Sequence, residues 1–362
     1  MTDSADKIDI KDLTPEQLAG WLQSRGIATY RANQVLRWIY SRQADSFDVI
    51  TDIKKELQQL LSTHFCLNRL TRIKVESSAD GTRKYLFKLS DNNCIESVLI
   101  PEKNHLTLCI STQVGCAQGC RFCLTARSGF VRNLTKNEIV SQVRDIMRDR
   151  EDARQLTNIV LMGMGEPLAN YDNVLRAVDT LTNRDVGLGF ANRRITISTA
   201  GLVPKLKTLG QDTGVNLAVS LNATDNPTRD RLMPINRTYP IETLLDACRS
   251  YPLPPHRRIT FEYILIKGIN DTPDDAGRLA HLLRPIRSKI NLIPFNAHEG
   301  SDFLPPPEPV ILKFQEILLD KNYTVIIRRS KGREISAACG QLRVKTLPPV
   351  DHNQNEKTDF TI

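Results

Sequence analysis

The spacing of hydrophobic and polar residues changes along the chain and divides it into three parts. Residues 9–66 place apolar side chains at helical intervals, as at Val35, Leu36 and Ile39, which predicts three short helices. Residues 71–100 alternate apolar and polar positions around a turn at 79–82, which predicts a β-hairpin and one following strand. From residue 106 onward, short β-branched apolar runs take turns with amphipathic helical segments.

The alternation after residue 106 predicts about six β/α units, fewer than the eight of a closed barrel. Nearly all-apolar strands of this kind suit a parallel sheet that is covered by helices. We therefore predict an α/β fold: an open, partial (β/α)6 TIM-type barrel with an N-terminal helical domain and a short β-hairpin linker. The functional site of such a fold is expected at the C-terminal ends of the strands.

These patterns suggest where the domains begin and end. We assign residues 1–70 to an N-terminal helical accessory domain, and residues 71–101 to a β-hairpin and strand extension. Residues 102–338 form the barrel core. Residues 339–362 form a C-terminal segment that ends in a polar tail, which we expect to be frayed after about residue 345.

Composition limits the setting in which the protein works. The chain has 362 residues, of which 40% are hydrophobic, and none of its apolar runs approaches the roughly 18–20 residues of a membrane helix. The first residues are acidic and polar, unlike a secretory signal, so we expect a cytoplasmic protein without membrane contact. The net charge of +8 favours an anionic partner such as nucleic acid, although many soluble proteins are as basic.

Three of the eight cysteines, Cys116, Cys120 and Cys123, follow the first core strand with the spacing C-x3-C-x2-C. A cytosolic chain does not favour a disulfide framework, and three thiolates on one loop require a cation. Structural zinc normally takes four protein ligands, and no second cysteine pair completes such a set. A 4Fe–4S cluster held by three cysteines would leave one iron open, which makes the cluster the better interpretation and zinc the alternative.

The cysteine spacing resembles that of the radical S-adenosylmethionine (SAM) superfamily, in which the open iron binds SAM and the cluster generates a 5′-deoxyadenosyl radical. Further segments narrow the resemblance to the RlmN-like RNA adenine-C2 methyltransferases. They occur in family order from about residue 30 to 342: "QVGCAQGCRFCLTARSGFVRNLT", "VLMGMGEPLANYDNV", "RITISTAGLVP", "AVSLNA", "RLMPINRTYPIE", "INLIPFN" and "SAACGQL".

This resemblance implies methylation of C2 of a specific adenine in the peptidyl-transferase centre of 23S rRNA. For some members it also implies methylation of the adenine beside the tRNA anticodon. The closest alternative is an adenine-C8 methyltransferase of the antibiotic-resistance (Cfr) type, which shares the fold, the cluster and both additional cysteines. An alternative of another class is a zinc-dependent RNA-binding module without catalysis.

The resemblance also implies roles for three residues outside the cluster. Cys339 accepts a methyl group from one SAM as a thiolate nucleophile, and a second SAM yields the radical that activates this methyl group. Glu96 takes the proton from adenine C2. Cys109 then attacks the sulfur of Cys339 and releases the product through a transient disulfide.

Further positions match SAM contacts of the family. A turn that permits close backbone approach ends the second core strand, and the remaining positions lie at later strand ends. These residues are Gly165, Glu166, Pro167, Ser198, Ser220, Leu221, Asn222 and Asn296. Asn222 is a departure, because many relatives have His there; Asn keeps one donor and one acceptor, so we expect SAM binding to survive.

Basic residues near the expected site are candidates for phosphate contacts with RNA. A reductant such as flavodoxin or ferredoxin is expected to supply the electron, and the protein is expected to be a monomer. The basic candidates are Arg121, Arg127, Arg132, Lys136, Arg229, Arg231, Arg237, Arg328, Arg329, Lys331 and Arg333.

Overall fold

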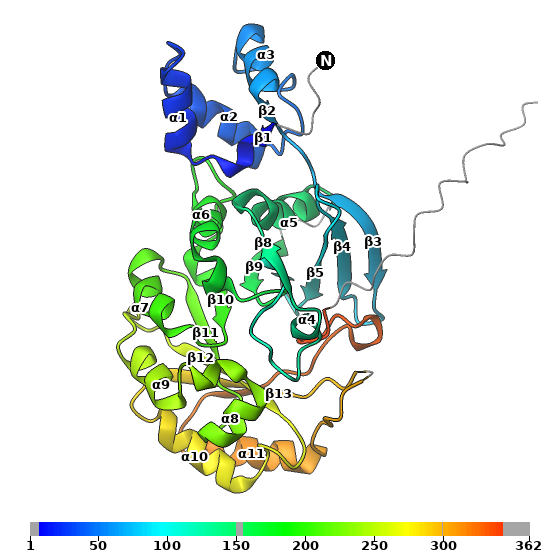
Figure 1. The fold of residues 1–362 in the computed structure, drawn as a ribbon, viewed down its shortest axis with the longest axis vertical. Coiled ribbons are helices and arrows are strands. Elements are labelled where there is room, and N and C mark those ends of the chain that lie inside the picture. Colours follow the sequence, from blue (N-terminus) through cyan, green and yellow to red (C-terminus); the bar gives the residue numbers. More distant parts are fainter. Residues whose placement is uncertain (1–6, 150–154, 299, 343–362) are drawn as a thin grey trace, which may run out of the picture.

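Ten strands form one sheet in the computed structural model, which describes residues 7–149, 155–298 and 300–342 (Figure 1). From edge to edge their order is β14, β13, β12, β11, β10, β9, β6, β5, β4 and β3. The strands from β6 to β14 are parallel to one another. They are β6 (Leu106–Cys109), β9 (Leu156–Leu161), β10 (Ile195–Thr199), β11 (Asn216–Ser220), β12 (Ile259–Leu265), β13 (Ser288–Pro294) and β14 (Val325–Ile327).

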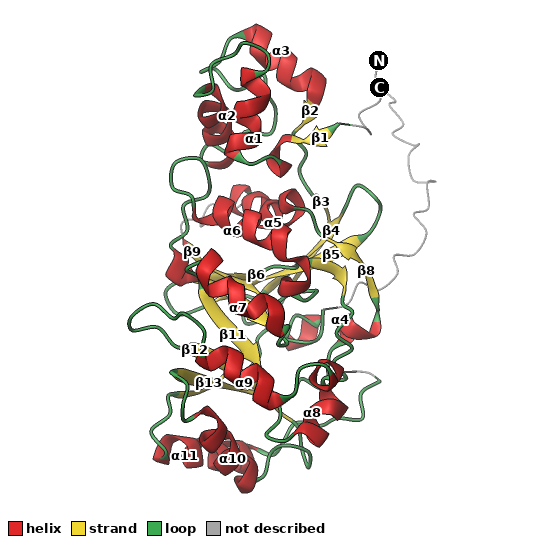
Figure 2. Cartoon of the chain, turned by 60° about the vertical axis from the view of Figure 1, so that its left-hand side comes forward, coloured by secondary structure: helices red, strands yellow, loops and turns green. Residues whose placement is uncertain are grey.

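Helices connect the parallel strands and cover the sheet, as Figure 2 shows for α6, α7 and α9. In the described part of the chain these connections make the six predicted β/α units and one final strand. The edge strands β3 and β14 do not pair with each other there, so the barrel is open, and the predicted fold class is confirmed. The connecting helices are α5 (Lys136–Arg148), α6 (Tyr171–Thr182), α7 (Val203–Asp212), α9 (Ile241–Arg249), α10 (Pro273–Leu283) and α11 (Glu308–Asp320).

The predicted hairpin and its following strand extend the same sheet in antiparallel register. They form β3 (Thr71–Ser77), β4 (Arg83–Lys88) and β5 (Cys94–Pro101), and β5 pairs with β6 so that Val98 lies opposite Cys109. Leu86 of β4 lies opposite Glu96 of β5. Directly opposed residues share a face, and so do residues two apart, so Glu96 and Cys109 lie on the same face of the sheet.

The N-terminal part contains the three predicted helices, α1 (Pro15–Gln23), α2 (Arg31–Tyr40) and α3 (Lys55–His64). Thr14 begins α1 with a capping box, whose partner is Gln17. Two short parallel strands, β1 (Ile8–Asp9) and β2 (Phe65–Cys66), close this part. It is joined to the core by the fully buried Arg144 of α5, whose Nε donates to the carbonyl of Ile39 at 3.0 Å.

Six short strands and helices were not predicted from the sequence. They are β1 and β2 of the N-terminal part, β7 (Gln113–Gly115), α4 (Leu124–Arg127), β8 (Phe130–Asn133) and α8 (Asn226–Leu232). The polar tail expected after about residue 345 lies outside the described residues. Within the described ranges, no helix is both long enough and apolar enough to span a bilayer.

Candidate active site

The loop that carries the three clustered cysteines is held at its base by a small antiparallel pair, β7 with β8. The amide of Cys116 donates to the carbonyl of Gly129 at 2.8 Å. Gly115 has φ +74°, and a Cβ there would lie 1.9 Å from the Gly129 oxygen, so the close strand approach requires glycine. The pairing of β7 with β8 therefore fixes the positions of both ends of the cysteine loop.

The far end of the loop is anchored to two distant segments. The amide of Arg121 donates to the carbonyl of Leu232 in α8 at 3.0 Å. The amide of Leu124, next to Cys123, donates to the carbonyl of Gly340 at 2.7 Å. The second bond brings the C-terminal segment to the cysteine loop, and Figure 1 shows this segment as the orange-red chain beside α4.

The cysteine loop borders a cavity of about 160 Å³ at the C-terminal strand ends, where the fold class predicts a site. All three cluster cysteines and Cys339 line it, together with Gly165, Glu166, Ser198 and Ser220 of the expected SAM contacts. Six predicted site residues are not among the lining side chains: Glu96, Cys109, Pro167, Leu221, Asn222 and Asn296.

The turn after β9 places Glu166 beneath the cavity. Its buried carboxylate accepts from the amide of Leu168 at 3.0 Å and from the amide of Ala200 at 2.7 Å. Burial raises the pKa of Glu166, and these hydrogen bonds oppose the rise. Gly165 has φ +104°, and a Cβ there would lie 2.6 Å from the Gln113 side chain. The turn is thus tightly packed between the ends of β9 and β10.

Arg229 of α8 supports the neighbouring strand ends from within the protein. Its fully buried guanidinium donates to the carbonyls of Ala200 at 2.8 Å, Leu221 at 3.0 Å and Ser220 at 3.2 Å. The prediction that Arg229 contacts RNA is therefore wrong. It is also wrong for Lys136, which is buried and donates to the carbonyl of Leu13 at 2.7 Å. Both side chains satisfy backbone carbonyls in the interior.

Asn222 and Leu221 follow β11 and are completely buried. Asn222 has φ +58°, and its Oδ1 accepts from the amide of Ile264 at 2.8 Å. The side chain of Asn222 thus links the loop that follows β11 to strand β12, beside the cavity. The SAM contact expected for these two residues stays a prediction.

Asn296 follows β13 and faces the C-terminal segment. Its Nδ2 donates to the carbonyl of Cys339 at 3.2 Å. Its Oδ1 is buried without a hydrogen-bond partner in the described structure. A buried unpaired acceptor is costly, so this oxygen is suited to a donor group of a bound ligand such as SAM.

The donor set on the cysteine loop suits an iron–sulfur cluster. Burial raises the pKa of the Cys116 thiol to about 12, and the charge on Cys123 adds to the rise. Burial, followed by the charges on Cys123 and Cys116, also raises the pKa of Cys120. Among the described residues, no three His, Cys, Asp or Glu side chains are gathered closely enough for a single metal ion. A 4Fe–4S cluster instead spreads its thiolate ligands over several irons and compensates their charge.

Cys109 and Cys339, 230 positions apart in the numbering, lie near each other as free thiols. Cys109 is buried at the end of β6, and burial, followed by the charge on Cys339, raises its pKa to about 12. Cys339 keeps accessible surface because it borders the cavity. Protein encloses its other sides, and this enclosure raises its pKa while the positive charge of Arg328 opposes the rise.

Glu96 lies on β5 with its side chain only 5% exposed. Its Oε1 is 3.1 Å from the Nζ of Lys84, which is 8% exposed. A surface salt bridge would be the ordinary role of such a carboxylate, but this pair is buried. The carbonyl of Glu96 accepts from Ser111 Oγ at 2.6 Å, which ties β5 to the chain just after Cys109.

The cavity also contains residues that the sequence reasoning did not single out. Glu262 of β12 and Met233 line it, and Glu262 accepts from Asn291 Nδ2 at 2.8 Å. Burial raises the pKa of Glu262, and the charge of Arg328 opposes this rise. The one available signal was a glutamate within the otherwise apolar strand "ITFEYIL". Arg328 was predicted only as a phosphate contact, and it lines the cavity.

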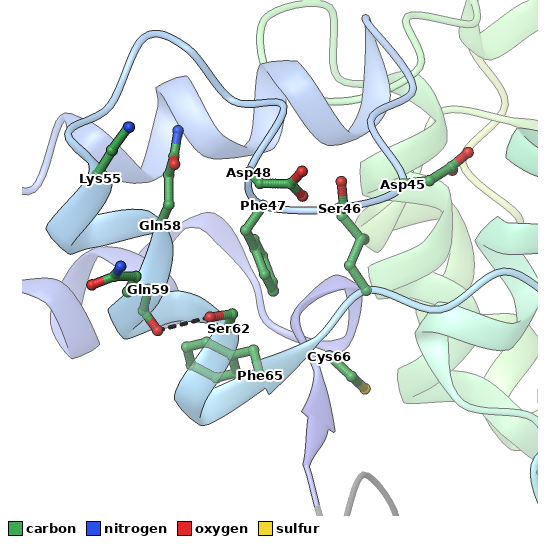
Figure 3. Close-up of a pocket in the computed structure, with 11 residues that line it drawn as sticks. Asp45, Ser46, Phe47, Asp48, Lys55, Gln58, Gln59, Ser62, Phe65 and Cys66 are labelled. Carbon is green, nitrogen blue, oxygen red and sulfur yellow. Dashed lines mark hydrogen bonds between the residues drawn. The ribbon is translucent and has the colours of Figure 1, made fainter.

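A second hollow, of about 500 Å³, lies in the N-terminal part between α3 and the loop at residues 45–48 (Figure 3). Its lining is mixed, and Asp45 is already paired with Arg144 at 2.7 Å and Arg148 at 2.6 Å. The hollow contains one thiol, Cys66, whose pKa is raised mainly by burial. The three cluster cysteines and Cys339 line the smaller cavity in the barrel instead.

Comparisons with known proteins agree with this geometry. Residues 8–67 match the family described as "Ribosomal RNA large subunit methyltransferase N-terminal domain", and residues 110–282 match the radical SAM superfamily. A relative from Desulfosudis oleivorans, named dual-specificity RNA methyltransferase RlmN, is 59% identical over 334 residues. The alignment covers 92% of this chain and 90% of the relative. The chain belongs to the RlmN family.

Other relatives support the same membership. A protein of the same name from Geobacter sulfurreducens is 55% identical over 93% of this chain and 92% of its own length. The crystal structure of a radical SAM methyltransferase from Sphaerobacter thermophilus superposes with a TM-score of 0.87. It is 44% identical and covers 93% of this chain and 99% of its own. As in other members of this family, a 4Fe–4S cluster and SAM are the cofactors.

Proposed function

We propose that this chain is a dual-specificity RNA methyltransferase. It transfers a methyl group from SAM to C2 of an adenine in the peptidyl-transferase centre of 23S rRNA and of the adenine beside the tRNA anticodon. The main support is that Cys339 and the cysteine loop line one cavity, with Cys109 close to Cys339, in a member of the RlmN family. The C8 alternative and the zinc module are not favoured, because the relatives are named RlmN.

In this proposal Cys116, Cys120 and Cys123 hold the cluster, and residues around the cavity hold SAM. When bound, these groups supply the methyl group and the radical that activates it. The SAM site includes Gly165, Glu166, Pro167, Ser198, Ser220, Leu221, Asn222 and Asn296. The backbone turn at 165–167 would allow close approach of SAM, and the buried, unpaired Oδ1 of Asn296 would be available as an acceptor for it.

The remaining chemistry is performed by side chains of the chain itself. Cys339 is the nucleophile that accepts the methyl group, and the nearby charge of Arg328 favours its thiolate. Glu96 accepts the proton from adenine C2. Cys109 attacks the sulfur of Cys339, so that an S–S bond forms and the bond between this sulfur and the methylene carbon on the base breaks. The proton lost by the Cys109 thiol is balanced by the proton that this carbon takes up to become a methyl group, and the disulfide must be reduced before the next turnover.

RNA approaches the cavity rim through exposed basic side chains. These are Arg121, Arg127, Arg231, Arg237, Arg329 and Arg333. The domain boundaries at residues 70, 101 and 338, with the helical part as an RNA-binding accessory domain, belong to the same proposal. So do an electron donor such as flavodoxin or ferredoxin, action as a monomer, and a cytoplasmic location.

The experiment is anaerobic reconstitution of the protein with iron, sulfide, SAM and a reductant, followed by incubation with 23S rRNA and with tRNA. Mass spectrometry of the digested RNA is expected to find 2-methyladenosine in both. Finding 8-methyladenosine alone would contradict the proposal. Cys120→Ala is the control, because loss of one cluster ligand is expected to abolish the product and the brown colour of the preparation.

The role of Cys109 has its own test. Cys109→Ala is expected to accumulate a covalent adduct of RNA with Cys339, because nothing then attacks the Cys339 sulfur. The adduct is detected as a slow, ribonuclease-sensitive band on a denaturing gel. Cys248→Ala is the matched control, since Cys248 is also buried but packs in α9 away from the cavity. Normal turnover by Cys109→Ala would remove Cys109 from the mechanism.

A further inference from the structure

We propose that Lys84 is a positioning residue that keeps Glu96 an ionised, correctly aimed base for removal of the adenine C2 proton, and that Glu76 in turn holds Lys84. This inference rests on the proposed function, in which Glu96 is the proton acceptor. It adds to that function a residue from the β-hairpin, a part of the chain to which no catalytic role is assigned above.

The three side chains form a row across three neighbouring strands. Lys84 Nζ lies 3.1 Å from Oε1 of Glu96 on β5 and 3.2 Å from Oε2 of Glu76 on β3. The strand register explains the row, because Glu76 is directly opposite Lys84 and Lys84 is one pair away from Glu96 on the same face. Exposure rises along it, from 5% for Glu96 and 8% for Lys84 to 31% for Glu76.

Burial of the Lys84–Glu96 pair costs desolvation free energy, so stability alone does not explain why the pair is there. Removing a carboxylate and an ammonium group from water costs several kcal/mol per ion, and their attraction does no more than offset that cost. A hydrophobic pair would give the hairpin equal or greater stability. A general base, in contrast, must stay ionised while it lies in a site closed to water, and a cation about 3 Å away provides that.

Within the sheet, Lys84 is an ion-pair partner of Glu96. The charged or titratable side chains that the register places on this face of β3 to β6 are Lys74, Glu76, Lys84, Lys88, Cys94, Glu96 and Cys109. Lys74 is 60% exposed and pairs with Glu76 at 2.8 Å. The C-terminal segment packs over the hairpin turn, where Ser78 Oγ donates to Glu334 at 2.8 Å, so the row lies close to the chain that carries Cys339.

The step itself is a proton transfer. The C2–H bond of the adenine adduct on Cys339 breaks, its proton moves to a carboxylate oxygen of Glu96, and its electron pair stays with the adduct. The positive charge of Lys84 stabilises the carboxylate before the transfer and favours release of the proton to solvent afterwards. Lys84 acts through Glu96 and does not contact the substrate.

The experiment compares Lys84→Met with Lys74→Met in the reconstituted holoenzyme. Both variants remove a lysine that pairs with Glu76, but only Lys84 reaches Glu96. Lys84→Met is expected to form S-methyl-Cys339 as fast as the wild type, because that step does not use Glu96. Its overall turnover is expected to fall about 10- to 100-fold, within the usual contribution of a general base. The RNA adduct on Cys339 is expected to accumulate, and Lys74→Met is expected to match the wild type.

A kinetic isotope effect separates positioning from mere support of the fold. With RNA that carries deuterium at adenine C2, Lys84→Met is expected to show an isotope effect about twofold or more above that of the wild type, because proton removal has become slower. If Lys84→Met does not fold, Lys84→Arg is compared in the same way. It keeps the charge but spreads it over a planar group, and a raised isotope effect is again expected.

The outcomes distinguish this inference from the proposed function. A wild-type protein that makes no 2-methyladenosine contradicts the proposed function. An active wild type with an unimpaired Glu96→Gln variant contradicts the acceptor role of Glu96. If Glu96→Gln is blocked while the Lys84 variant turns over with an unchanged isotope effect, the inference alone is wrong. Equal loss of Cys339 methylation and turnover in a folded Lys84 variant also overturns it, because the lysine is then structural.

Discussion

The amide of Leu124 donates a hydrogen bond of 2.7 Å to the carbonyl of Gly340, which joins the residue after the last cluster cysteine to the residue after Cys339. One position further along the cysteine segment and two positions further along the C-terminal segment, Thr125 Oγ1 donates to the carbonyl of Leu342 at 2.7 Å. The segment that carries Cys339, the nucleophile of the proposed reaction, is thus hydrogen-bonded to α4, the short helix that follows the cysteine loop. Its position relative to the cavity depends on this contact.

Thr125→Val is expected to loosen the C-terminal segment, because the buried carbonyl of Leu342 loses its donor. The free energy of unfolding is expected to fall by about 1–3 kcal/mol, the cost of a buried unsatisfied polar group. Formation of S-methyl-Cys339, followed by mass spectrometry of the intact protein, is expected to slow severalfold. Thr63→Val is the control, because its hydroxyl bonds to its own exposed helix. Equal methylation rates in both variants would show that the Thr125 contact does not position Cys339.

Gly115→Ala is expected to prevent assembly of the cluster. Its Cβ would lie 1.9 Å from the carbonyl oxygen of Gly129, so β7 and β8 must separate and the cysteine loop loses its base. Gly129→Ala is a matched control, since Gly129 also has φ +74° but no atom within 4 Å of the added Cβ. The control is expected to cost about 1–2 kcal/mol of backbone strain and to bind iron normally. Iron content after anaerobic reconstitution is the measurement, and equal iron in both variants would contradict the prediction.

The barrel was predictable from the sequence because its signals are local. Strands such as "INLIP" and helices such as "NEIVSQVRDIM" have the periodicity of the elements that they form, and each is long enough to show it. The elements that were missed are short, as is β7 with three residues and α4 with four. Such segments contain little more than one period of a pattern, and tertiary pairing decides their conformation.

Only those residues of the candidate site that belong to a recognisable sequence motif could be predicted from the sequence. The spacing of the three cluster cysteines identifies the ligand loop directly. Arg229 and Lys136 were wrongly predicted to lie on the surface, because their burial depends on backbone carbonyls of other elements, such as Ala200 for Arg229 and Leu13 for Lys136. Glu262 was overlooked for the same reason, since its hydrogen-bond partner Asn291 comes from the next strand. Propensity alone does not reveal partners of this kind.

Arg229→Met is expected to weaken SAM binding. The effect arises inside the protein, because Arg229 is buried and does not reach RNA. The variant leaves the carbonyls of Ala200, Ser220 and Leu221 without their buried donor. The free energy of unfolding is expected to fall by about 3–5 kcal/mol, as for other buried charged networks that lose one partner. SAM binding, measured by calorimetry on the reconstituted protein, is expected to weaken at least severalfold.

The control for Arg229→Met is Arg231→Met, two residues further along, where the side chain is exposed. Its stability is expected to stay within about 0.5 kcal/mol of the wild type. Its SAM affinity is expected to be unchanged, while its affinity for RNA falls and depends less on salt. An Arg229 variant that binds SAM normally would show that the three carbonyls keep their positions without the guanidinium.

Lys136 makes the stability of the interface between the N-terminal part and α5 depend on pH. Burial lowers its pKa to about 8, although the charge of Asp12 opposes the shift. An unfolded lysine titrates near 10.4, so between about pH 8 and pH 10.4 the unfolded chain binds more protons at this position than the folded chain. The contribution of Lys136 to the free energy of unfolding therefore rises with pH across that window, by on the order of 3 kcal/mol.

The measurement is urea unfolding of the wild type and of Lys136→Met at pH 7.5 and pH 10. Buried cysteines such as Cys248, with a pKa raised to about 12 mainly by burial, destabilise both proteins alike as the pH rises above about 9. The difference between the two proteins cancels this shared loss and isolates Lys136. We expect the wild type to gain stability relative to the variant at pH 10. A difference that stays constant or shrinks with pH would mean that Lys136 remains charged in the folded protein, held by Asp12 and the carbonyl of Leu13.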